Sequence, residues 1–224
     1  MKNRFFVDHP LAAGSRIALS FEEIKHFKVT RIQPGETVEI INGKGILAKA
    51  SFEGKDQVVI NQIKTAPIQK YESVLFQAIA EGSHLDFIVE KGVELGITCF
   101  VLFAAEKSKI KNLSENRLVR LKKLTISALK QSKRLYLPEI RVVCHLNEYQ
   151  GKLDHYYLAD PSGPPLLKTP EANCGIIVGP ESGLTKNEID HLVKTLEAEK
   201  VNLSDNVLRC ETAAMISAYL LGRK

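Results

Sequence analysis

The sequence lacks any segment that would place the protein in or beyond a membrane. No run of about 18 consecutive apolar residues occurs in the 224-residue chain, so we predict no membrane span. Residues 1–8 lack the apolar stretch and the small-residue cleavage site of a signal peptide. We therefore expect a cytoplasmic protein. An apolar fraction of 44% with 25% charged residues is typical of a globular chain with a proper core.

Cysteine is also scarce. The four cysteines stand far apart, with no Cys-x-x-Cys pair and no histidine at ligand spacing: Cys99, Cys144, Cys174 and Cys210. Zinc sites usually show such pairs, so we expect no metal. We predict buried free thiols in a reducing compartment instead.

Several ligand-binding fingerprints are missing. Gly179 and Gly183 do not form Gly-x-Gly-x-x-Gly, so a Rossmann dinucleotide enzyme is poorly supported. Ser182 follows Gly179 by three places, which excludes the Gly-x-Ser-x-Gly elbow of a hydrolase. Neither a Walker loop nor a kinase signature occurs.

Positive charge is concentrated in one segment. The formal charge of the chain is +5, but residues 107–141 hold eleven Lys or Arg against only Glu115 and Glu139. That segment carries +9 and the rest of the chain −4. Such a patch suits a polyanion such as RNA, because neutralised phosphates release counterions. A solvated helix face explains the charge equally well.

Residues 1–70 predict a small all-β domain. Strands are expected at 36–41, 46–52 and 57–63, with a turn at 42–45. Short strands joined by close turns indicate a little barrel or sandwich.

Residues 71–224 predict an α/β domain with a largely parallel sheet, since strands alternate with helices. The expected strands are 73–80, 100–103, 156–158, 175–178 and 201–203. The expected helices are 83–96, 114–134, 185–199 and 209–221. Ser83 and Asp86 are expected to cap the first helix and Gly96 to end it, while Thr185 and Glu188 form a capping box.

Three loops of this domain are expected to follow strands, at 159–165, 179–184 and 204–209. Ligands of open α/β sheets bind beyond the carboxyl ends of the strands. Such loops often only turn the chain. Without a family resemblance, the residues therefore predict no more than an α/β enzyme or a nucleic-acid-binding protein.

Taken together, the loops resemble a known family. Gly-Pro-Glu-Ser-Gly-Leu at 179–184 resembles the Gly-Pro-Glu-Gly-Gly-Leu signature of the ribosomal RNA small subunit methyltransferase E family. Residues 203–213, ending Leu-Arg-Cys-Glu-Thr-Ala, resemble its Leu-Gly-x-Arg-Ile-Leu-Arg-x-Glu-Thr-Ala. Four further segments match in family order, at 4–7, 26–35, 90–96 and 131–138. The matches run from Arg4 to Ala213.

The resemblance implies a fold and an activity. It implies a PUA-like RNA-binding β-barrel over 1–70 and a SPOUT α/β methyltransferase domain over 71–224, with a trefoil knot at about 156–213. It also implies S-adenosylmethionine as cofactor, a homodimer, and methylation of N3 of a uridine in the decoding region of 16S ribosomal RNA of the small subunit.

The resemblance also assigns residues. Arg209 would stabilise negative charge on the uracil ring, and Glu211 or Glu181 would take the N3 proton or orient Arg209. The cofactor contacts would be Leu158, Val178, Gly179, Pro180, Glu181, Gly183, Leu203, Ser204, Val207, Leu208 and Thr212. The RNA contacts would be Arg4, Arg31, Lys122, Lys123, Gln131, Ser132 and Arg134.

Some positions depart from the family pattern. Ser182 and Ser204 stand where the family has glycine, and Asn206 stands where it has arginine. Ser204 would narrow the cofactor slot if that position needs a positive φ. These departures leave open a non-catalytic RNA-binding or ribosome-assembly protein on the same scaffold. Another SPOUT activity is the second alternative, which the Leu-Arg-x-Glu-Thr-Ala stretch and the PUA-like start disfavour.

Overall fold

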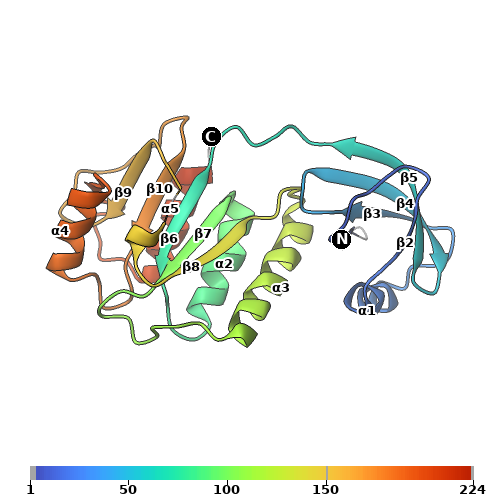
Figure 1. Ribbon diagram of the computed structural model, residues 1–224, viewed down its shortest axis with the longest axis horizontal. Coiled ribbons are helices and arrows are strands. Elements are labelled where there is room, and N and C mark those ends of the chain that lie inside the picture. The colour runs from blue at the N-terminus through green and yellow to red at the C-terminus, as the bar shows by residue number, and fades with distance from the viewer. Residues whose placement is uncertain (1–3, 150, 223–224) are drawn as a thin grey trace. The chain divides into compact units, whose positions relative to one another are not determined.

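The structure is a computed structural model that describes residues 4–149 and 151–222. The chain divides into two compact units (Figure 1). The N-terminal unit contains residues up to 68 together with 129–137, and the C-terminal unit contains 69–128 and the residues from 138 onward.

The N-terminal unit is built on a curled five-stranded sheet (Figure 1). Its strands are β1 (Arg4–Phe6), β2 (Arg16–Ala18), β3 (Thr37–Ile41), β4 (Ile46–Gly54) and β5 (Gln57–Thr65). The order is β1-β3-β4-β5-β2, so β1 and β2 are the two edges. The three strands predicted here are confirmed, and the open edges make this sheet a half-barrel.

This unit also contains a helix, α1 (Phe21–Thr30), that the all-strand prediction missed. The side chain of Ser20 accepts the backbone N–H of Glu23 at 3.3 Å and caps the helix. Phe27 stacks on Phe5 with ring centroids 3.9 Å apart, which ties the helix to the sheet. Ser-x-x-Glu at 20–23 is a helix-start signal that was available in the sequence.

Residues 129–137 pack on the N-terminal sheet, although they lie within the range predicted as the second domain. The backbone N–H of Gly45 donates to Leu135 O at 2.9 Å, and that of Leu137 donates to Gly43 O at 2.8 Å. Gly45 has φ +85°, and a Cβ there would lie 2.3 Å from the Tyr136 hydroxyl. Only glycine fits this close approach.

The C-terminal unit is a six-stranded sheet in which every pairing is parallel. Its strands are β6 (Ser73–Ala78), β7 (Cys99–Phe103), β8 (Glu139–Val143), β9 (His155–Ala159), β10 (Cys174–Val178) and β11 (Glu199–Val201). The helices are α2 (His84–Leu95), α3 (Glu115–Ser132), α4 (Lys186–Thr195) and α5 (Cys210–Gly222), with a 3-10 turn η1 (Leu146–Glu148). The predicted α/β class with a parallel sheet is confirmed; the trefoil knot stays a prediction.

The strand order reverses between β6 and β10. The sheet runs β11-β9-β10-β6-β7-β8: the chain goes from β6 to β7 and β8 on one side, and on the other side β10 lies between β9 and β6. β6 and β10 are neighbours, paired from Cys174 with Ser73 to Val178 with Gln77. Ligands of such sheets bind at the carboxyl ends of the strands near this reversal.

Helix ends agree with the sequence in part. Thr185 and Glu188 form the predicted capping box of α4, and Gly96 ends α2 at φ 107°. α4 ends at Thr195, four residues before the predicted end, and Glu197 has a left-handed φ of 53°. The predicted strand 201–203 accordingly shifts to β11, two residues earlier.

Asp86 does not cap α2 as predicted, and Ser83 makes no side-chain cap hydrogen bond. The buried carboxylate of Asp86 instead pairs with Arg117 and Arg120 of α3, each at 2.8 Å. Two guanidinium groups at a buried carboxylate are a stronger partner than one backbone N–H. Asp86 therefore fastens α2 to α3.

The edge strand β8 was also missed by the sequence. Its residues are exposed or half-buried throughout, so the strand shows no continuous apolar run. It pairs with β7 in register from Glu139 opposite Cys99.

Candidate active site

A cavity of about 410 Å³ lies where the loops after β9, β10 and β11 meet. All three belong to the C-terminal unit, so the cavity lies within one compact body. The lining residues are Leu158, Ala159, Asp160, Pro161, Val178, Gly179, Pro180, Glu181, Ser182, Gly183, Leu184, Ile189, Asn202, Leu203, Ser204, Asn206, Val207, Leu208, Cys210 and Ala213. Its size is within the usual range of about 300–1,000 Å³ for small-molecule sites.

The loop after β9 is held against β11 by backbone hydrogen bonds. Asp160 N donates to Val201 O at 2.9 Å, and Asn202 N donates to Pro164 O at 2.7 Å. A Cβ added to Gly163 would lie 2.5 Å from both Lys200 C and Val201 N, so the two backbones approach too closely for any side chain. Gly163 therefore fixes one wall of the cavity.

The loop after β10 is stiffened by polar contacts. Ser182 donates its hydroxyl to Lys107 O at 2.9 Å, and Gly183 N donates to Pro180 O at 2.9 Å. Glu181 accepts the backbone N–H of Glu81 at 3.0 Å. Serine in place of the family's glycine thus adds a tether to this loop.

The loop after β11 closes without glycine. Asn202 Oδ1 accepts the N–H of Ser204 at 3.1 Å, and Ser204 Oγ accepts the N–H of Asn206 at 3.1 Å. Among the described non-glycine residues, positive φ values occur at Arg31, Lys55, Lys133 and Glu197, and not at Ser204. The condition under which Ser204 would narrow the slot is therefore not met.

The structure brings together nearly all of the residues predicted to contact the cofactor. Each of them lines the cavity except Thr212, which lies exposed in the first turn of α5. The sequence reading missed Asp160 and Asn202, which line the cavity from the loop after β9 and from beyond β11. The signal was available for Asp160, which follows a predicted strand, since polar side chains at strand ends gather at one edge of a parallel sheet. It was hidden for Asn202, which lay inside the predicted strand 201–203.

The three predicted catalytic residues differ in their surroundings. Glu181 lines the cavity, whereas Arg209 and Glu211 do not. Arg209 is exposed, just before α5. Burial raises the pKa of Glu181, but donors from the Glu81 backbone and from His84 outweigh it, so the net pKa falls below its usual value. The backbone N–H of Glu211 lowers the pKa of its carboxyl, and Arg209 adds to this.

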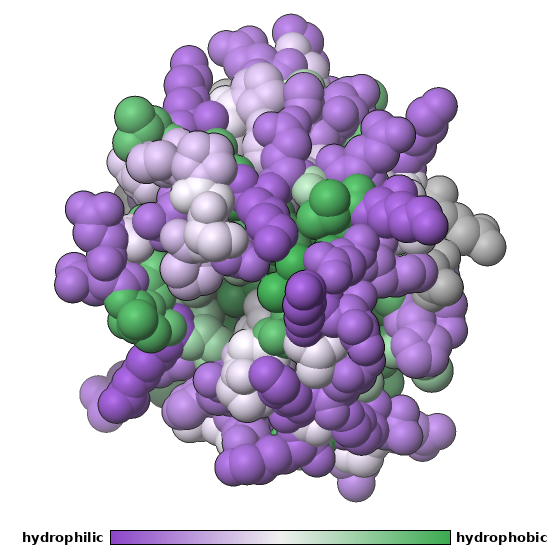
Figure 2. Space-filling view, turned by 90° about the vertical axis from the view of Figure 1, so that its left-hand side faces the viewer, coloured by the Kyte–Doolittle hydropathy of each residue, from purple (hydrophilic) through white to green (hydrophobic). Residues whose placement is uncertain are grey.

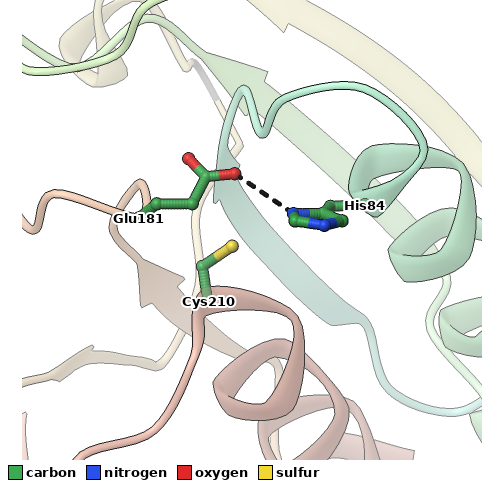
Figure 3. Close-up of side chains that lie close together, drawn as sticks. All are labelled: His84, Glu181 and Cys210. Carbon is green, nitrogen blue, oxygen red and sulfur yellow. Dashed lines mark ion pairs between the residues drawn. The ribbon is translucent and has the colours of Figure 1, made fainter.

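Glu181 and Glu211 share a cluster with two residues that the sequence did not single out as site residues. His84, at the start of α2, points toward Glu181, and Cys210, at the start of α5, lies beside both (Figure 3). His84 Nδ1 lies 3.5 Å from Glu181 Oε1 and 4.0 Å from Glu211 Oε2. Burial, together with the two carboxylates, raises the pKa of the Cys210 thiol to about 12.

Three cysteines are buried free thiols as predicted, namely Cys99, Cys174 and Cys210. The prediction is wrong for Cys144, which is exposed. Cys144 follows directly on the exposed edge strand β8, where no element covers it.

The predicted RNA contacts fall into two groups. Arg31, Lys122, Lys123 and Gln131 are exposed, and Ser132 is half-buried. Arg4 is only 8% exposed and its guanidinium donates to Glu39 Oε2 at 2.9 and 2.7 Å, so it fastens β1 to β3. Burial lowers the pKa of Arg134 to about 10.

The basic segment is less one-sided in the structure than in the sequence. Several of its side chains pair with acidic residues from other segments: Lys109 with Glu81, Arg117 and Arg120 with Asp86, and Lys130 with Glu23. Each of these ion pairs lies within one unit and joins elements of that unit. Lys122 and Lys123 of α3 are exposed and stay candidates for contact with a polyanion.

Hydrophobic surface is recessed between hydrophilic side chains on one face of the molecule (Figure 2). Val207, at the cavity, is 95% exposed, and Leu167 is 87% exposed.

Within residues 4–149 and 151–222, no helix is both long and apolar enough to cross a membrane.

Comparison with known proteins identifies the family of the chain. A family model described as an RNA methyltransferase domain matches residues 67–222, and one described as an RNA methyltransferase PUA domain matches residues 20–63. The chain belongs to the RNA methyltransferase family. The cavity lies wholly within the segment matched by the methyltransferase domain.

Curated relatives of this family are similar over nearly their whole length. Ribosomal RNA small subunit methyltransferase E of Aquifex aeolicus is 28% identical, over 93% of this chain and 94% of the relative. The protein of the same name from Rickettsia conorii is 27% identical, over 95% of this chain and 92% of the relative.

A solved structure shares the fold. The ribosomal RNA small subunit methyltransferase E of Neisseria gonorrhoeae, bound to S-adenosyl methionine, superposes with a TM-score of 0.88. The match covers 97% of this chain and 95% of that one, at 24% identity. The half-barrel and the parallel sheet are thus a known combination in this family.

Proposed function

We propose that this RNA methyltransferase transfers a methyl group from S-adenosylmethionine to N3 of a uridine in 16S ribosomal RNA, in the cytoplasm. The observation that carries the proposal is the cavity of about 410 Å³ at the loops after β9, β10 and β11, of which the last two carry the family's motifs. Relatives named for methylation of small-subunit ribosomal RNA match almost the whole chain and support the substrate class.

The cavity suits this cofactor. Leu158, Val178, Leu203 and Leu208 give it apolar walls for a flat heterocycle, as in most small-molecule sites. Asp160 and Glu181 add carboxylates, which favour the positive sulfonium and ammonium groups of S-adenosylmethionine. We assign the cofactor contacts to the cavity-lining residues, without Thr212.

The chain's own residues would handle the proton and the charge. S-adenosylmethionine supplies the methyl group, so the N–H proton at N3 must pass to a base. Glu181 and Glu211 remain the two candidates, and Arg209 would stabilise the negative charge that develops on the uracil ring. The target base must be unpaired or leave its stack, at a cost of a few kcal/mol.

We also propose how the rest of the chain contributes. Residues 1–70 would dock RNA and residues 71–224 would carry methyl transfer, in a homodimer. Exposed Arg31, Lys122, Lys123 and Gln131 are the favoured RNA contacts. Two of the departures that motivated the non-catalytic alternative fit their loops, because Ser182 and Ser204 make hydrogen bonds there; the third, Asn206 in place of arginine, keeps that alternative open.

A pair of neighbouring substitutions tests the cavity. Asn206 lines it and is exposed, so Asn206→Trp should fill it without disturbing the core. Asp205 is also exposed but does not line the cavity, so Asp205→Trp is a matched control. We expect saturable binding of S-adenosylmethionine in the wild type and the control, and loss in Asn206→Trp. Equal binding in all three proteins would contradict the assignment.

A further inference from the structure

The cluster at the end of β6 and β10 contains four different metal-ligating side chains from three elements of the C-terminal unit. His84 comes from α2, Glu181 from the loop after β10, and Cys210 from α5 (Figure 3). Glu211 follows Cys210 in α5. The imidazole, the thiol and one carboxylate each place a ligand atom within 4.8 Å of the others. The sequence separates these residues by up to 126 positions, which is why spacing rules did not reveal them.

Two of the separations between ligand atoms match the edges of a tetrahedral zinc site. With Zn–N, Zn–O and Zn–S bonds of about 2.0, 2.0 and 2.3 Å, neighbouring ligand atoms lie about 3.3–3.6 Å apart. His84 Nδ1 lies 3.5 Å from Glu181 Oε1, and Cys210 Sγ lies 3.4 Å from Glu211 Oε2. The third separation, from His84 Nδ1 to Glu211 Oε2, is 4.0 Å and needs a small rotation of one side chain.

The surroundings favour a cation. His84 Nδ1 is a buried ring nitrogen that faces Glu181 Oε1 at 3.5 Å, although the imidazole as a whole stays about half exposed. Cys210 is buried, whereas Glu181 and Glu211 are partly open to solvent, which leaves an entry path. The two carboxylates carry more negative charge than the one nearby guanidinium, that of Arg209, balances.

We propose that His84, Glu181, Cys210 and Glu211 form a binding site for a divalent transition-metal ion of the zinc type. A mixed set of nitrogen, sulfur and oxygen donors selects such an ion over magnesium or calcium, which take oxygen ligands. On binding, the Cys210 S–H bond breaks, its proton leaves to solvent, and the thiolate sulfur bonds the metal. Glu181 and Cys210 also line the cavity that we assign to the cofactor, so a metal bound here would adjoin the methyl-transfer site.

Cobalt is the probe of choice, because a cobalt–thiolate bond gives an absorption band that zinc lacks. Co²⁺ is added to the full-length protein, and we expect one ion per chain with a thiolate-to-cobalt band that Zn²⁺ then removes. Cys210→Ser should abolish the band. His84→Ala should weaken binding by at least about tenfold, because even outer-shell substitutions cost that much. The exposed Cys144→Ser is the matched control and should leave the band unchanged.

Three results would overturn the site: no band in the wild type, a band that survives Cys210→Ser or His84→Ala unchanged, or a band that disappears in Cys144→Ser. Melting curves of the variants without metal show whether each is folded. His84 is on the surface side of α2 and provides a second variant if Cys210→Ser does not fold.

One consequence rests on the proposed function. A bound metal would occupy Glu181 and Glu211, so Zn²⁺ should inhibit methyl transfer reversibly with a chelator, and His84→Ala should reduce this sensitivity. Metal binding without inhibition would keep the site and count against the carboxylates as proton acceptors. Inhibition without the cobalt band would refute the site and leave the methyl-transfer proposal intact.

Discussion

Gly163 offers a sharp test of how the cavity wall is built, since it is remote from the proposed chemistry. In Gly163→Ala the new Cβ would lie 2.5 Å from Lys200 C and Val201 N, both backbone atoms that cannot rotate away. Carbon atoms in contact prefer about 3.5–4.0 Å, so the loop must move from β11 by about 1 Å.

The loss of stability in Gly163→Ala follows from the hydrogen bonds that this shift breaks. Asn202 N to Pro164 O at 2.7 Å and Leu166 N to Asn202 O at 2.9 Å join the loop to the strand end. Each such bond contributes about 0.5–1.5 kcal/mol net, so the variant should lose about 1–3 kcal/mol. If the cofactor binds only when the loop is back in its native position, this free energy is subtracted from the free energy of binding. The Kd for the cofactor should then rise by about 5- to 150-fold.

Calorimetric titration with S-adenosylmethionine measures this loss. Ser162→Ala is the matched control in the same loop: it removes only the exposed hydroxyl that donates to Asp160 at 2.7 Å, and its Kd should change by less than about threefold. A wild-type Kd and melting temperature in Gly163→Ala would refute the reasoning, because the close approach of the two backbones would then contribute nothing to stability or to cofactor binding.

Three further predictions concern catalysis, RNA and pH. Arg209→Ala should lower the rate of methyl transfer by about 100- to 1,000-fold while cofactor affinity is kept, since Arg209 does not line the cavity; wild-type turnover would refute its role. Replacing Lys122 and Lys123 by Gln should reduce the log-log salt slope of RNA binding by about one unit per phosphate contact, whereas an unchanged slope would make them a solvated face. Burial raises the pKa of Asp160, but donors from Ser162 and the charge of Lys200 lower it below its usual value overall. Ionised Asp160 therefore stabilises the fold above its ordinary pKa, and this contribution disappears as pH falls through the lowered one. Urea unfolding between about pH 5 and pH 2 should show a smaller pH dependence in Asp160→Asn, and equal slopes would contradict the shift.

Most helices and strands could be predicted from the sequence, because they depend on patterns of neighbouring residues. Alternation defined β4 and β5, and the capping box at Thr185 and Glu188 defined the start of α4. α1 was missed because it sits among strands, and β8 because an exposed edge strand has no apolar run. The docking of residues 129–137 on the N-terminal sheet depends on long-range contacts that no local pattern reports.

Only part of the candidate site could be predicted from the sequence. The motif loops after β10 and β11 gave the cavity walls, since parallel strands end at one edge. The sequence did not reveal His84 and Cys210, because His84 reaches Glu181 only through the pairing of β6 with β10, which no local pattern reports. The charge count overstated the basic patch, because Asp86, Glu81 and Glu23 reach it from other segments.

The central claim is the reaction itself. Small ribosomal subunits that lack the modification are incubated with the protein and labelled S-adenosylmethionine, and the RNA is digested to nucleosides for mass spectrometry. We predict labelled N3-methyluridine in the 16S RNA, with loss of the signal in Asn206→Trp and not in Asp205→Trp. A different labelled nucleoside, or RNA binding without methyl transfer, would contradict the account.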